Sequence, residues 1–116
     1  MEITGGSDRD VDRVVLVDDL SVGTLVSLID RLQETEGAQF FFREAEMDDA
    51  YRHADADVRL AVHAGSDRET ISQLERVRQL IFSAHDFVGW GNIPEAVQEL
   101  NKVIDIKIGL GDKTGR

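Results

Sequence analysis

The chain has 116 residues and a formal net charge of −10, from 23 Asp and Glu against 13 Lys and Arg, and it has no cysteine. Its length indicates one domain that is large enough to bury a core. The composition excludes disulfides and cysteine chemistry, and it fits a cytoplasmic location. We expect no nucleic-acid partner, because phosphates need cations, and no membrane partner, because no apolar run approaches about 18 residues.

The two ends of the chain are predicted to flank a single globular domain over residues 13–110. Residues 1–12 are rich in Gly and Asp and are expected to form a flexible arm, and residues 111–116 a polar tail. Residues 14–17 are apolar and, apart from Leu16, β-branched, which predicts a strand or an extended segment. Because a lone strand needs a partner, we expect this segment to bind another protein or to pair across a homodimer, through Val14, Val15, Leu16 and Val17.

Residues 21–35 are predicted to form the first helix. Asp19 or Ser21 is expected to cap it, because a short side chain with an oxygen accepts hydrogen bonds from the first free amides. Gly37 is expected to stop the chain from continuing as helix. The apolar residues recur every three or four positions and so share one helix face: Val22, Leu25, Val26, Ile29 and Leu32.

Residues 38–64 admit two interpretations. In the first they form one long helix, because their apolar positions keep near-heptad spacing and no Gly, Pro or Asn interrupts them. In the second, residues 39–43 and 58–63 are strands, since one holds three consecutive phenylalanines and the other alternates. Together with a strand at residues 13–17 these would make a small α/β domain. The missing turn residues favour the long helix.

The last two helices are predicted over residues 67–88 and 94–108. Ser66 and Glu69 have the spacing of a capping box, in which each side chain binds the other residue's amide. Pro94 suits the first position of a helix, because its missing N–H would have no partner there.

The predicted fold is a mainly α, four-helix bundle-like domain with a short N-terminal extended segment and a C-terminal helical hairpin. Short links between successive helices imply antiparallel neighbours. Gly109 is expected to end the last helix, as a glycine often does.

One helix face carries a candidate metal site. If residues 38–64 are helical, Asp49, His53 and Asp57 lie at positions i, i+4 and i+8 on one face. Two carboxylates around an imidazole can hold a divalent metal. The simpler explanation is the solvated face that every amphipathic helix has. The sequence contains no residue pattern typical of catalysis, so we expect a binding protein rather than an enzyme.

The sequence therefore favours an interaction protein. Trp90, between two glycines, and Phe87 are candidate partner-binding residues, because aromatic side chains are enriched at interface hot spots. The net negative charge favours a basic protein partner. We expect a small, non-enzymatic accessory, adaptor or immunity-type subunit. The alternatives are a metal- or small-ligand-binding domain that uses Asp49, His53 and Asp57, and a structural homo-oligomer subunit.

Overall fold

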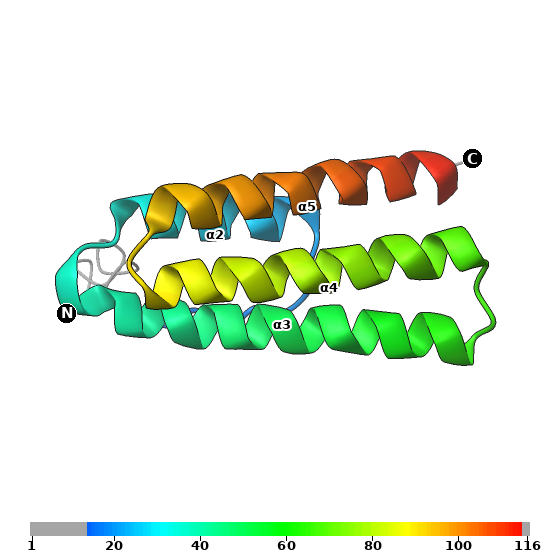
Figure 1. The fold of residues 1–116 in the computed structure, drawn as a ribbon, viewed down its shortest axis with the longest axis horizontal. Helices are drawn as coiled ribbons and strands as arrows, with labels where there is room; N and C mark the ends of the chain where they lie inside the picture. Colours follow the sequence, from blue (N-terminus) through cyan, green and yellow to red (C-terminus); the bar gives the residue numbers. More distant parts are fainter. Residues whose placement is uncertain (1–13, 115–116) are drawn as a thin grey trace, which may run out of the picture.

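The structure is a computed structural model in which residues 14–114 are described, with side chains to residue 110. In this part of the chain the regular elements are all helical: α2 (Val22–Glu34), the 3-10 turn η2 (Gly37–Gln39), α3 (Phe40–His63), α4 (Arg68–Gly89) and α5 (Ile93–Thr114). Successive α-helices run antiparallel (Figure 1). The predicted four-helix bundle-like domain, with an extended N-terminal segment and a C-terminal helical hairpin, is therefore confirmed.

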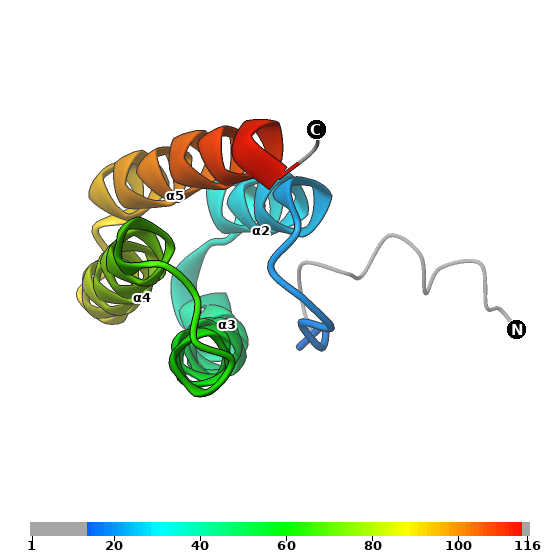
Figure 2. The ribbon, with the colours of Figure 1, turned by 90° about the vertical axis from the view of Figure 1, so that its right-hand side faces the viewer.

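The helices pack in the order α3, α4, α5 and α2, so that α2 lies against α5. The view along the bundle shows the four helices at the corners of an irregular quadrilateral (Figure 2). With 13 residues, α2 is much shorter than α5 with 22. It therefore covers only one half of the molecule, the half in which α3 begins and α4 ends (Figure 1).

The core combines large aliphatic side chains with buried alanines. The fully buried large apolar residues come from all four helices: Leu25, Leu28, Leu32, Met47, Val77, Ile81, Val88, Leu100 and Val103. Buried alanines lie on α3, α4 and α5: Ala50, Ala54, Ala61, Ala84 and Ala96. Because an alanine side chain is small, α4 can pack closely against α3, whose core face is rich in alanine.

Side-chain hydrogen bonds at the N-termini of α2 and α4 explain where these two helices begin. Ser21 caps α2 as predicted, and its hydroxyl accepts from the Thr24 amide at 3.1 Å. The cap of α4 is Asp67, which accepts from the Thr70 amide at 2.8 Å, so the predicted capping box at Ser66 is wrong. The carboxylate of an aspartate one residue further along offers a stronger, charged acceptor to the same helix end.

Two predictions about backbone geometry are corrected. Gly109 does not end the last helix: α5 continues to Thr114, through part of the predicted polar tail. A glycine inside a helix costs only about 1 kcal/mol relative to alanine, and Gly109 has no left-handed backbone. The alternative α/β fold is wrong for the described residues, since residues 40–43 and 58–63 lie within α3. The predicted N-terminal arm lies outside the described residues.

Candidate functional site

Residues 14–20, which we call the N-terminal strap, form neither helix nor strand and lie beside α3, to which the strap is hydrogen-bonded. The Val15 N–H donates to Glu46 Oε2 at 2.6 Å, and the Val17 N–H donates to Asp49 Oδ2 at 2.9 Å. A strand partner would satisfy alternate backbone groups in a similar way. Here the side chains of a helix take the place of that partner.

A histidine completes this set of contacts. His53 Nε2 lies 2.6 Å from the Val17 carbonyl oxygen and donates to it, since a carbonyl can only accept. Positions 46, 49 and 53 follow one another at helical spacing, so all three side chains project from one face of α3. The strap therefore binds α3 through its backbone, at both an N–H and a C=O group of Val17.

Along residues 14–17 the side chains alternate between exposed and more buried positions. Val17 is only 2% exposed and Leu20 is also buried, whereas Leu16 is 74% exposed. Val14 is exposed and Val15 is half-buried. The segment that we expected to seek a partner thus has a place in the chain's own core, and partner binding by Val14, Val15, Leu16 and Val17 stays a prediction.

The three candidate metal ligands are held in separate interactions. Asp49 and His53 both contact the strap. Asp57 Oδ2 lies 4.0 Å from Lys107 Nζ on α5. Within the described residues no group of three or more His, Cys, Asp or Glu side chains is placed to hold a metal ion. Metal binding by these residues stays a sequence-based prediction.

The acidity of Asp49 makes attachment of the strap depend on pH. Burial raises the pKa of Asp49, but hydrogen bonds from Val17 and Arg52 and the charges of Arg52 and His53 together lower it by more, so the pKa lies below the usual 3.8. The ionised carboxylate therefore stabilises the fold above its unfolded pKa, and this contribution is lost as the pH falls through the folded pKa.

We expect the Val17 amide to be protected from hydrogen exchange at neutral pH and to lose protection as the pH falls below about 4. Amide exchange followed by NMR, corrected for the intrinsic pH dependence of exchange, measures this. The Asp49→Asn variant should lack this pH response. Equal protection of Val17 in the wild-type protein at pH 7 and pH 2.5 would contradict the expectation.

Beneath the strap lies a buried ionic network. Glu46 Oε1 accepts from Arg31 Nε at 3.1 Å, and Glu46 Oε2 lies 3.4 Å from Arg43 Nη2. The side chains of Glu46 and Arg43 are completely buried. The network joins α2, α3 and the strap, and it explains why α3 carries charges on its core side.

A second feature is a set of exposed aromatic side chains. Phe41 is 70% exposed, Phe82 50% and Trp90 86%. The start of α3 lies beside the end of α4 because the two helices are antiparallel (Figure 1). Phe82 also packs against Tyr51, with ring centroids 6.0 Å apart. Phe41, Phe82 and Trp90 thus lie on neighbouring parts of α3 and α4.

The sequence identified only part of this set. Trp90 was predicted as a partner-binding residue. It is the C-cap residue that follows α4, and its side chain is exposed to solvent. Phe87, the other candidate, is partly buried against the core. The Asn92 N–H donates to the Phe87 carbonyl at 2.8 Å, and Gly91 has a φ of 75°, so the turn that presents Trp90 needs glycine there.

A shallow groove lies between α3 and α4 beside these aromatics. It has a volume of about 390 Å³ and is lined by Phe41, Glu44, Ala45, Asp48 and His85. His85 Nε2 and Asp48 Oδ1 are 2.7 Å apart across it. We call this hollow, with the adjoining Tyr51–Phe82 pair, the α3–α4 groove.

Negative charge predominates at the end of the bundle that holds the groove. Residues 32–48 and 82–98 contain one Lys or Arg, Arg43, whose side chain is completely buried. The same ranges form the end of the bundle that holds both the α2–α3 and α4–α5 links (Figure 1). Their carboxylates at the surface are Glu34, Glu36, Glu44, Asp48, Asp86 and Glu95. We call this half of the molecule the acidic end.

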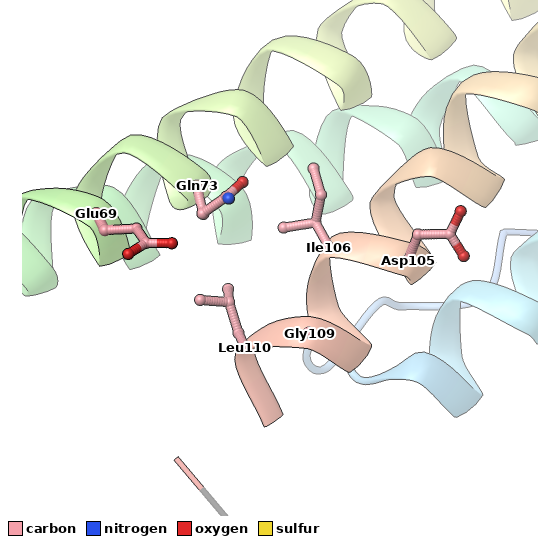
Figure 3. Close-up of a pocket in the computed structure, with 6 residues that line it drawn as sticks. All are labelled: Glu69, Gln73, Asp105, Ile106, Gly109 and Leu110. Carbon is pink, nitrogen blue, oxygen red and sulfur yellow. The ribbon is translucent and has the colours of Figure 1, made fainter. Parts of the chain in front are cut away.

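Cations gather in the other half of the bundle, on α3 and α4: Arg52, Arg59, Arg68 and Arg76 are all exposed. Another hollow lies there, between the start of α4 and the end of α5, lined by Glu69, Gln73, Asp105, Ile106, Gly109 and Leu110 (Figure 3). Asp105 points away from Glu69, so the two carboxylates do not converge on one point. This arrangement does not suggest acid–base chemistry.

No protein-family model, curated protein or solved structure matches the chain. None of the helices in the described part of the chain is long and apolar enough to cross a membrane.

Proposed function

We propose that the protein is a small, non-enzymatic interaction protein, of the accessory, adaptor or immunity type, that docks a basic protein partner through its acidic end. The observation that supports this proposal is the coincidence of exposed Phe41, Phe82 and Trp90 with a surface on which the accessible charges are negative. Large aromatic side chains left in water mark interaction surfaces more often than scattered aliphatic ones do.

Aromatic and acidic groups contribute differently to such an interface. Each aromatic side chain can bury about 150–250 Å², which supplies most of the favourable free energy of binding. The carboxylates raise the rate of encounter with a positive surface and disfavour negative ones. The two features together therefore favour a partner that is both basic and partly apolar.

Charge reversal at the acidic end tests the proposal. Asp48 and Asp86 are exposed there, and Glu75 and Asp105 are exposed in the other half. Replacing either pair with lysine changes the net charge by the same amount. We expect the Asp48→Lys/Asp86→Lys variant to lose a basic partner captured from cell extract, and the Glu75→Lys/Asp105→Lys control to retain it.

The salt dependence gives a second readout of the same capture. At 1 M salt the Debye length falls to about 3 Å, so attraction between surface charges is largely screened. We expect the wild-type protein to lose most of the captured partner under that condition. Capture that is insensitive both to charge reversal at the acidic end and to salt would contradict the proposal.

A further inference from the structure

The shape of the α3–α4 groove is suited to binding one more helix. Two antiparallel helices border it, and the small side chain of Ala45 lies between the larger Phe41 and Asp48. From Phe41 to Tyr51 the groove follows α3 for ten residues, a length of about 15 Å. That length matches about three turns of a helix laid along it.

We propose that the α3–α4 groove binds an amphipathic, basic helix of the partner. Apolar side chains of that helix occupy the hollow beside Phe41 and Ala45, and its Lys or Arg side chains face Glu44 and Asp48. This inference rests on the function proposed above and adds to it the structural class of the partner segment and its place on the molecule.

The fold itself favours a helical occupant over an extended one. An extended peptide usually adds to the open edge of a sheet, and the described part of this chain contains no strand. The backbone-binding side chains of α3 are already engaged by the strap, through Glu46, Asp49 and His53. A groove between two helices, in contrast, suits the ridges of a third helix.

The charges disfavour a second copy of this chain as the occupant of the groove. A two-fold contact through the groove would bring Glu44 and Asp48 of one copy against the same residues of the other. Like charges facing each other across an interface are destabilising. Glu44 and Asp48 line the groove. The acidic end that holds the groove carries further surface carboxylates at positions 34, 36, 86 and 95, so charge complementarity favours a positive partner.

Two synthetic peptides of equal composition provide the test. One is an 18-residue sequence of leucine and lysine with an apolar stripe at helical spacing, and the other is the same residues scrambled so that no stripe forms. Each is titrated into the full-length protein, with binding measured by calorimetry and by fluorescence of Trp90, the single tryptophan of the chain. We expect the striped peptide to bind at least about tenfold more tightly.

Matched variants on α3 locate the binding site. Phe41 in the groove is 70% exposed, and Leu60 at the other end of the same helix is 66% exposed. We expect Phe41→Ala to weaken binding of the striped peptide about tenfold and Leu60→Ala to leave it unchanged. Circular dichroism of both variants serves as the control that their fold is retained.

Several outcomes would overturn the inference. Equal affinity for the two peptides would show that the protein recognises charge alone. The function proposed above would then stand, but the assignment of the α3–α4 groove as a helix-binding site would be wrong. Equal effects of Phe41→Ala and Leu60→Ala would place the site elsewhere. A wild-type dimer in light scattering that Phe41→Ala converts to a monomer would assign the groove to a second copy.

Discussion

Replacing Glu46 with alanine is expected to lower the free energy of unfolding by about 3–5 kcal/mol, because it removes the carboxylate that pairs with Arg31 and with the buried Arg43. The Glu46 carboxylate lies 3.1 Å from Arg31 Nε and 3.4 Å from Arg43 Nη2, and it also accepts from the Val15 N–H at 2.6 Å. The side chains of Glu46 and Arg43 are completely buried, so water cannot replace the lost carboxylate without opening the interface.

Urea unfolding followed by circular dichroism measures this loss. Glu34→Ala is the matched control, because Glu34 is an exposed glutamate on the neighbouring helix, and we expect it to change stability by no more than about 0.5 kcal/mol. Glu46→Gln keeps the shape and removes the charge, so its cost should be nearly as large as that of Glu46→Ala. A loss below about 1 kcal/mol for Glu46→Ala would show that the network is solvated.

The long helix α3 was predictable from the sequence, but its buried face was not. The absence of Gly, Pro and Asn from residues 38–64 correctly favours one helix. Arg43 and Glu46, however, have the sequence character of a solvated face, and the structure buries both. Because these charges and several alanines replace large apolar residues, the apolar periodicity of α3 is weak, which explains why a strand interpretation competed with it.

The strap shows why local pattern alone could not assign the N-terminal segment. Residues 14–17 have the composition of a strand, and in the structure they belong to no helix and no sheet. Their hydrogen-bond partners lie 31, 32 and 36 positions further along the chain, on a helix. No periodicity within residues 14–17 indicates that Glu46, Asp49 and His53 would serve as that partner.

The acidic end was partly visible in the sequence. The absence of Lys and Arg from residues 79–101 can be counted directly, and the glycines around Trp90 correctly suggested a turn. The exposure of Phe41 and Phe82 could not be predicted, because each adjoins other apolar residues and only the helix phase decides which one faces the core. That phase is set by packing between α3 and α4, which involves residues far apart in the chain.

Val17→Asp is expected to lower the free energy of unfolding by about 2–4 kcal/mol, whereas Leu16→Asp should change it by less than about 0.5 kcal/mol. The two positions are adjacent, but Val17 is 2% exposed and Leu16 is 74% exposed. A carboxylate at position 17 would enter the core beside Asp49, whose own carboxylate already accepts from the Val17 N–H. Burial of the new carboxylate and its repulsion from Asp49 both destabilise the folded variant.

Detachment of the strap sets the upper limit of that cost. Once the strap leaves α3, the new aspartate is solvated, and the loss includes the burial of Val17 and Leu20, at about 1.5–3 kcal/mol for each side chain. The backbone hydrogen bonds of the strap to α3 are lost with it. Val17→Asp should therefore abolish hydrogen-exchange protection of the Val15 and Val17 amides while the amides of α4 stay protected, and Leu16→Asp should leave both sets protected. If both variants lost protection equally, the alternation of exposed and buried side chains along residues 14–17 would be refuted.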